Sequence, residues 1–109
     1  MIRARFSPKA ERDLDEHCGH IAADNPEAAE RVRQTILHTA DFLVQHRELG
    51  RRLRKAALRH AQIRWFVVPK FRNYLIFYQP FQETIVVVRV LHAAQDWTRF
   101  FPTSPSQPI

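Results

Sequence analysis

Residues 63–92 read IRWFVVPKFRNYLIFYQPFQETIVVVRVLH, and this stretch decides the fold. It contains three runs rich in valine, isoleucine and aromatic residues, which is the composition of β-strands. Segments with proline and other turn-forming residues separate the runs, so consecutive strands are predicted to be antiparallel neighbours. The predicted strands are Ile63–Val68, Tyr74–Gln79 and Thr84–His92.

Side chains alternate between the two faces of a strand, and in the last run this alternation separates two sets of residues. We expect the valine side to pack on helices, and the side that carries Arg89 to be at least partly open. The valine side is Val86, Val88, Val90 and His92, and the other side is Ile85, Val87, Arg89 and Leu91.

Upstream of the strands, two start signals predict a pair of helices. Ser7-Pro8 supplies an N-cap and a first helical residue, and apolar residues then recur at helical spacing to about Ala23. Asn25-Pro26 repeats the signal for a second helix, whose region is closed by Gly50. With a link of two or three residues, the two helices are predicted to form an antiparallel hairpin.

With a short strand at Ile2–Phe6, this order predicts an α+β protein: an N-terminal strand, a helical hairpin, then three antiparallel strands. The hairpin is expected on one face of a mainly antiparallel sheet. A short helical turn is expected at Gln95–Phe101, where aromatic side chains either cap the core or form a docking surface. Residues 1–101 are predicted to be one domain, followed by a disordered Pro/Ser-rich tail at 102–109.

Length and composition exclude several classes of protein. The chain has 109 residues, enough for one core, and no apolar run approaches the roughly 20 residues that cross a bilayer. Its single cysteine, Cys18, excludes an internal disulfide, and two glycines are too few for a glycine-rich phosphate loop. His17 and His20 have no nearby acid at a suitable spacing to complete a metal site. We expect a small cytoplasmic domain with no cofactor, no metal and no membrane partner.

The net charge of +6 is concentrated in one segment. Between Arg47 and Arg64 the only acid is Glu48, whereas the rest of the chain is balanced. Guanidinium groups bind phosphates and carboxylates in a bidentate fork, so this segment is predicted to contact phosphates or an acidic partner. The alternative is a solvated loop. The basic residues of this segment are Arg47, Arg51, Arg52, Arg54, Lys55, Arg59 and Arg64.

One set of residues suggests RNA cleavage. Such a site needs a base for the 2′-hydroxyl, an acid for the leaving oxygen and cations on the phosphate. Arg64 and Arg89 are the candidate cations, which we place on one face of the sheet, and His92 is the titratable group. Strand alternation nevertheless puts Arg89 and His92 on opposite faces. In the alternative interpretation, His92 closes the sheet edge with a hydrogen bond to Asp96.

Five segments resemble the RelE/ParE superfamily of bacterial type II toxins, and within it the ParE branch more closely. The resemblance spans about residues 2–98, and it is most specific where Arg89, His92 and Asp96 match an Arg-x-x-His-x-x-x-Asp pattern. It implies a compact toxin encoded with a small antitoxin that folds around it. The segments are FSPKAERDLDE, IAADNPEAAERV, ELGRRLR, the pair IRWFVV and YLIFY, and VVRVLHAAQDW.

The resemblance implies two alternative targets. ParE-like toxins inhibit DNA gyrase and leave DNA breaks, whereas RelE-like toxins cleave messenger RNA in the ribosome. The RNA-cleaving relatives add a Tyr, His, Glu or Lys to basic residues on the sheet face, and the face of Arg64 and Arg89 offers no such partner. We therefore favour a DNA gyrase inhibitor over a ribosome-dependent mRNA endoribonuclease. A relic that binds antitoxin but has lost its toxicity is a third hypothesis.

The partner implied by the resemblance is a cognate antitoxin. We expect it to be acidic, to fold on binding and to lie along the helical hairpin and the sheet edge. The basic segment is compatible with either the antitoxin or the target. The residues predicted to contact one of these partners are Arg51, Arg52, Arg54, Arg59, Arg64, Arg89, His92, Asp96 and Trp97.

Overall fold

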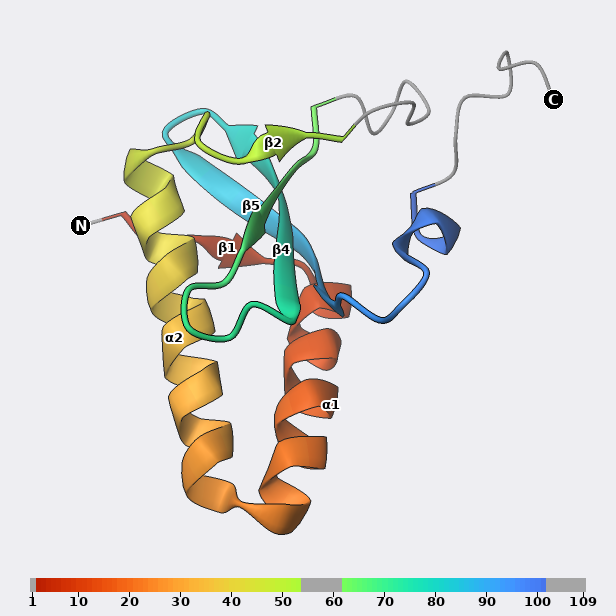
Figure 1. The fold of residues 1–109 in the computed structure, drawn as a ribbon. Coiled ribbons are helices and arrows are strands. Elements are labelled where there is room, and N and C mark those ends of the chain that lie inside the picture. Colours follow the sequence, from red (N-terminus) through yellow and green to blue (C-terminus); the bar gives the residue numbers. More distant parts are fainter. Residues whose placement is uncertain (1, 54–61, 102–109) are drawn as a thin grey trace, which may run out of the picture.

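A helical hairpin covers one face of a five-stranded sheet in the computed structural model, which describes residues 2–53 and 62–101 (Figure 1). The strand order is β1-β5-β4-β3-β2, with β1 parallel to β5 and the other neighbours antiparallel. The predicted α+β class and order of elements are confirmed, and β2 is an additional strand. The elements are β1 (Arg5–Phe6), α1 (Pro8–Asp24), α2 (Pro26–Gln45), β2 (Arg51–Arg52), β3 (Arg64–Val67), β4 (Tyr74–Phe81), β5 (Thr84–His92) and a 3-10 helix (Trp97–Arg99).

Two predicted features lie outside the described residues. They are the disordered tail at 102–109 and residues 54–61 of the basic segment, which include Arg54, Lys55 and Arg59. Within the described part of the chain, neither helix is long and apolar enough to cross a membrane.

Side-chain caps begin both helices, as predicted. The Ser7 hydroxyl accepts a hydrogen bond from the Ala10 N–H (3.0 Å), and the Asn25 side chain accepts one from the Ala28 N–H (3.0 Å). A proline follows each cap, at the position where a missing N–H costs nothing. Asn25 also ends α1, because its N–H donates to the Ile21 carbonyl (2.8 Å). The link is therefore one residue, shorter than the predicted two or three.

Apolar side chains fill two clusters, one on each face of the sheet. The larger cluster lies between the hairpin and the sheet, where Ile36 and Leu43 of α2 pack with Ile76 of β4. The smaller cluster lies on the far face, where the C-terminal segment covers Phe77 and Leu91. The aromatic residues of that segment thus cap the core, which is the first of the two expected roles. They are Trp97, Phe100 and Phe101.

A β-bulge in β5 changes which residues face the hairpin. Phe77 pairs with Arg89 but Tyr78 pairs with Val87, so Val88 is an extra residue without a partner on β4. The prediction that the valine side packs on the helices is therefore wrong for Val88, which packs with the far-face cluster, and is confirmed for Val90. Arg89 lies on the far face, as predicted, because it is paired with Phe77. The helix-facing residues of β5 in the larger cluster are Ile85, Val87 and Val90.

Candidate functional site

Side chains from the start of α1 bond the edge of β5 that β1 leaves uncovered. β1 has only two residues, so the backbone groups of β5 beyond it need other partners. The Ser7 hydroxyl donates to the Val88 carbonyl (3.0 Å). The Asp13 carboxylate accepts from the Val90 N–H (3.0 Å), and His17 Nε2 lies 2.8 Å from the Val90 carbonyl. The helix thus replaces a strand along this edge and places Asp13 against the sheet.

Arg89 is held by this carboxylate. Its Nε and Nη2 donate to the two oxygens of Asp13, each at 2.7 Å, in a bidentate pair. Its guanidinium carbon also lies 4.2 Å from the centre of the Phe100 ring. The hydrogen bonds to Asp13 raise the pKa of Arg89 above its ordinary value. Arg89 is therefore a fixed, permanently charged group.

A hollow of about 510 Å³ opens beside Arg89. Lys9 and Arg12 reach it from the first turns of α1, so among the residues that the structure describes three cations and no carboxylate line it. Lys9 and Arg12 form no ion pair within residues 2–53 and 62–101. The hollow is suited to a phosphate or a carboxylate. The remaining lining residues are Ser7, Pro8, Ile63, Gln79, Val88, Phe100 and Phe101.

Arg64 lies on the other face of the sheet. It pairs with Tyr78, which belongs to the cluster under the hairpin, whereas Arg89 pairs with Phe77 of the far-face cluster. Its Nη1 donates to the carbonyls of Glu48 (3.0 Å) and Gly50 (2.7 Å). The expectation that Arg64 and Arg89 share one face is therefore wrong. Their partners on β4, Tyr78 and Phe77, are consecutive residues, and consecutive residues of a strand face opposite sides of the sheet.

His92 ends β5 and is separate from both arginines. Strand alternation places it opposite Arg89, as predicted, and its ring meets Tyr74 edge-on with centroids 5.2 Å apart. His92 Nδ1 accepts a hydrogen bond from the Ala94 N–H (3.0 Å), and the His92 N–H donates to Gln95 Oε1 (2.6 Å). The imidazole thus stabilises the turn that follows the strand.

Two further predicted residues lie beyond this turn. Asp96 is exposed and directly precedes the 3-10 helix. Trp97 begins that helix and packs on Phe77 with ring centroids 6.0 Å apart. Trp97 and Arg89 are therefore on the same face of the sheet.

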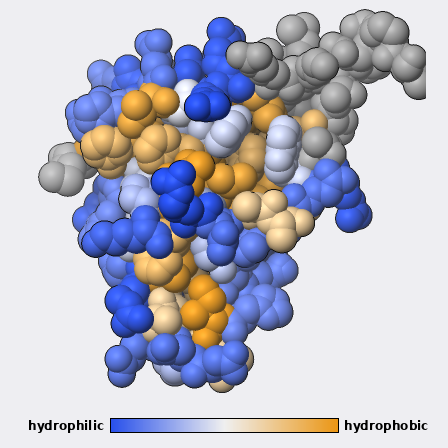
Figure 2. Space-filling view, in the orientation of Figure 1, coloured by the Kyte–Doolittle hydropathy of each residue, from blue (hydrophilic) through white to orange (hydrophobic). Residues whose placement is uncertain are grey.

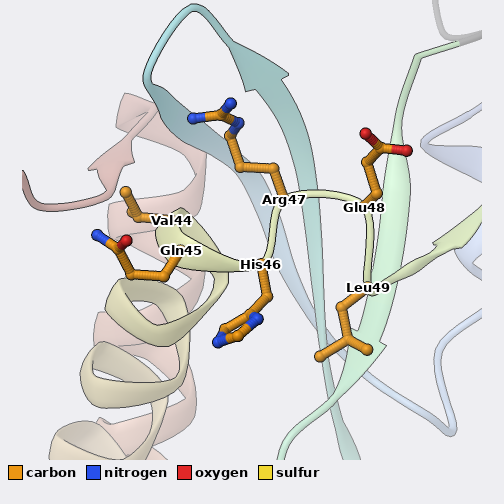
Figure 3. A pocket seen from close by; sticks show the side chains of 6 residues that line it. All are labelled: Val44, Gln45, His46, Arg47, Glu48 and Leu49. Atoms are coloured by element: carbon orange, nitrogen blue, oxygen red, sulfur yellow. The ribbon is translucent and has the colours of Figure 1, made fainter.

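The segment between α2 and β2 forms a second candidate surface, around a hollow of about 570 Å³ lined by residues 44–49 (Figure 3). Tyr78 holds this segment from inside the protein: its hydroxyl accepts from the Gly50 N–H (2.8 Å) and donates to the Arg47 carbonyl (2.9 Å). Burial raises the pKa of Tyr78. A Cβ on Gly50 would lie 2.6 Å from the Tyr78 hydroxyl oxygen, so glycine is required here for close approach.

Two arginines of the basic segment, Arg51 and Arg52, are exposed on β2, the last strand in the order of the described sheet. Arg51 lies over the Trp65 ring, with 5.7 Å from its guanidinium carbon to the ring centre. Arg52 stands opposite Arg64 in the pairing of β2 with β3. Arg54 and Arg59 lie outside the described residues. The structure thus brings Arg52 and Arg64 together and keeps both away from Arg89.

The sequence interpretation missed Lys9 and Arg12 in the lining of the hollow, and it missed Asp13, for which a signal existed. Asp13 is 8% exposed and lies three residues after Ala10, at helical spacing within the buried stripe of α1. A charged residue within an apolar helical stripe is a signal that a buried partner exists. Its partner, Arg89, is a charged residue within an apolar stretch of β5. Each of these two charged residues lies among apolar neighbours because it is paired with the other.

The fold and its surfaces define a class of protein. It is a small α+β protein in which a helical hairpin covers one face of the sheet, and arginines lie on the remaining sheet surfaces, where partners can bind. Residues 4–97 match the family described as the ParE toxin of the type II toxin-antitoxin system, parDE, and the chain belongs to this family. It is therefore a type II toxin of the RelE/ParE superfamily, and membership implies a cognate antitoxin as its partner.

Two individual proteins are similar to the chain. Toxin RelE3 of Caulobacter vibrioides is 27% identical over 95 residues, which cover 87% of this chain and 98% of that toxin. A solved structure of the chromosomal ParDE TA system from P. aeruginosa has a TM-score of 0.68 at 20% identity, covering 84% of this chain and 96% of that one. The structural likeness confirms the fold.

Proposed function

We propose that this toxin acts in the cytoplasm by binding and poisoning DNA gyrase, without chemistry of its own, and that its cognate antitoxin neutralises it. The observation that carries the proposal is the separation of the three residues that are candidates for RNA cleavage. Arg64 and Arg89 are on opposite faces of the sheet, and His92 is at the end of β5.

Each of these three side chains is also engaged within the protein. Arg64 bonds two backbone carbonyls, Arg89 bonds Asp13, and His92 accepts from the Ala94 N–H. In the described part of the chain, the hollow of about 510 Å³ beside Arg89 is lined by no His, Tyr, Asp or Glu, and an adjoining hollow of about 490 Å³ is lined by three acids, of which Asp13 is bonded to Arg89 and Asp15 to Arg33. General acid–base catalysis needs such a group within hydrogen-bond reach of the reacting atoms. The arrangement therefore favours binding over catalysis.

A supercoiling assay with purified gyrase tests the proposal. Wild-type toxin is expected to inhibit supercoiling in proportion to its concentration, and toxin mixed first with its antitoxin is expected not to. Gyrase activity that is unaltered at saturating toxin would contradict the proposal. Growth that is unimpaired by expression without antitoxin would instead favour a non-toxic relic.

A ribosome-dependent mRNA endoribonuclease is the second candidate, and the hollow beside Arg89 favours it. Its volume lies within the roughly 300–1,000 Å³ that is usual for ligand sites, and three cations line it. This candidate predicts translation-dependent cuts in transcripts that are lost in Arg89→Ala and His92→Ala. Arg12→Ala is expected to disturb the fold less than Arg89→Ala does, because Arg12 is exposed and makes no ion pair in the described residues. Intact transcripts after induction of the wild type would exclude the candidate.

A further inference from the structure

The hollow of about 510 Å³ beside Arg89 combines charged and apolar side chains. On the face of the molecule shown in Figure 2, hydrophilic side chains predominate and the apolar ones gather in a few patches. The hollow brings both kinds together, because α1 contributes cations to it and the C-terminal segment contributes aromatic rings. A ligand that fills it therefore needs an anionic part and an apolar part.

The charge of the hollow is set by three cations and one neighbouring acid. Lys9, Arg12 and Arg89 line it, and Asp13 offsets the charge of Arg89 through their bidentate pair. Lys9 and Arg12 make no ion pair among the residues that the structure describes. About two positive charges are therefore left for a ligand. A phosphate monoester carries about −1.5 to −2 charges at pH 7, whereas a phosphate diester carries about −1.

Arg89 is prepared for such a ligand. Asp13 holds its Nε and Nη2, and its guanidinium carbon lies 4.2 Å from the centre of the Phe100 ring. Its Nη1 makes no hydrogen bond within the described residues, so this group is left to donate to an anion. A donor that is already fixed loses little conformational entropy on binding.

The remainder of the hollow suits a flat organic group. Its volume lies within the roughly 300–1,000 Å³ that is usual for small-molecule sites, and a phosphate ion alone would leave most of it unfilled. Nucleobases pack against apolar and aromatic side chains, and a glutamine amide can bond a base edge. The side chains available for these contacts are Ile63, Gln79, Val88, Phe100 and Phe101.

We propose that this hollow binds a nucleoside monophosphate. Lys9, Arg12 and Arg89 hold the terminal phosphate, and the base lies against the apolar part of the lining. The phosphate is a monoester, because that group matches the charge left by the pairing of Arg89 with Asp13. The inference goes beyond the proposed function, since the ligand requires neither gyrase nor a cut transcript.

Calorimetric titration of the full-length toxin with AMP tests the site. We expect a Kd between about 10 μM and 1 mM, as for a small ligand at a partly exposed site. Inorganic phosphate and adenosine each lack one of the two parts, and each is expected to bind at least about tenfold more weakly. Glutarate matches the charge of the monoester without its geometry, and the dinucleoside monophosphate ApA offers only a diester. Both are expected to bind more weakly than AMP.

Substitution of the two unpaired cations locates the phosphate. The double variant Lys9→Ala with Arg12→Ala is expected to weaken AMP binding at least about tenfold, because charge-assisted hydrogen bonds are lost. Both side chains are exposed, so the fold is expected to persist. Arg31→Ala is the matched control and should stay within about twofold of wild type. Arg31 is an exposed residue near the start of α2, at the opposite end of the hairpin from Lys9 and Arg12 (Figure 1).

Glu16→Gln should change the affinity in the opposite direction. Glu16 lines the adjoining hollow together with Lys9, Arg12 and Arg89, so its charge repels a bound phosphate. Its removal is expected to tighten AMP binding by up to about twofold, the size of a solvent-screened interaction. Weaker binding of AMP to Glu16→Gln would contradict the placement of the phosphate.

Nuclear magnetic resonance gives a readout that needs no variant. AMP is expected to shift the signals of the Gln79 side-chain amide and the Val88 methyl groups, which line the hollow. AMP binding that leaves both signals unchanged would place the nucleotide elsewhere and overturn the proposal.

The remaining outcomes separate this site from the proposed function. Equal affinity for AMP and ApA would overturn the assignment to a monoester. Equal affinity for AMP and glutarate would show that charge alone is recognised, and would overturn the nucleotide. No binding at about 10 mM AMP, ten times the highest expected Kd, would overturn the site and leave inhibition of gyrase to be judged by the supercoiling assay.

Discussion

The ion pair between Asp13 and Arg89 yields the most quantitative prediction. Asp13 is 8% exposed and accepts three hydrogen bonds, two from Arg89 and one from the Val90 N–H. Asp13→Ala removes all three acceptor contacts and leaves a guanidinium whose side chain is only 18% exposed. Removing one partner of a buried pair costs about 3–5 kcal/mol. Because Arg89 borders the open hollow, we expect the lower end, about 3 kcal/mol.

A double-mutant cycle measures the interaction free energy between Asp13 and Arg89 separately from the contacts that each makes with other residues. Arg89→Met is expected to cost about 3 kcal/mol as well, since it leaves the carboxylate with only the Val90 N–H. The double variant leaves no unpaired charge and is expected to cost about 4 kcal/mol, which gives a coupling of about 2 kcal/mol. Denaturant unfolding of the four proteins measures these differences.

A second ion pair, which joins α1 to α2, provides the control. Arg33 and Asp15 are 3.0 Å apart at the surface, so Asp15→Ala is expected to cost less than about 1 kcal/mol. A cost of Asp13→Ala no larger than that of Asp15→Ala would refute the reasoning. So would effects of the two buried substitutions that are additive within about 0.5 kcal/mol.

Three further predictions concern the inside of the fold. Gly50→Ala is expected to destabilise the protein by about 1–3 kcal/mol in denaturant unfolding, because its Cβ would lie 2.6 Å from the Tyr78 hydroxyl oxygen and 2.9 Å from the Trp65 carbonyl. Burial raises the pKa of Tyr78, so its contribution to stability is complete below the unfolded value of about 10 and is lost as the pH rises further. Tyr78→Phe should reduce the fall of the free energy of unfolding with rising pH in this alkaline range. An equal fall in the variant and in the wild type would contradict this prediction. Burial likewise raises the pKa of Cys18, so a thiol reagent at neutral pH should modify it rapidly only after unfolding, and fast reaction of the native protein would contradict this assignment.

The helices were predictable because their signals are local. Ser7-Pro8 and Asn25-Pro26 specify where each helix begins, through contacts within three residues of the cap. The three long strands were predictable for a related reason, since their composition persists over enough residues to stand out. Strand β2 was not predictable, because two arginines carry no strand signal and pair with β3 only through tertiary structure.

The faces of the sheet were harder to predict than its strands. Alternation along β5 fails at Val88, where an extra residue shifts every later side chain to the other face. The relative faces of Arg64 and Arg89 depend on the register of both strands against β4, which no local pattern specifies. The candidate RNA-cleaving set was assembled from residue types, and the structure separates its members because register sets their positions.

Gyrase poisoning without catalysis is the central claim, and one induced culture tests it most directly. Toxin is expressed without antitoxin, and chromosomal breaks and transcript ends are mapped in the same cells. The account predicts chromosomal breaks that depend on gyrase, with transcripts left intact. Transcripts cut within translated codons, in cells whose chromosome is unbroken, would contradict it.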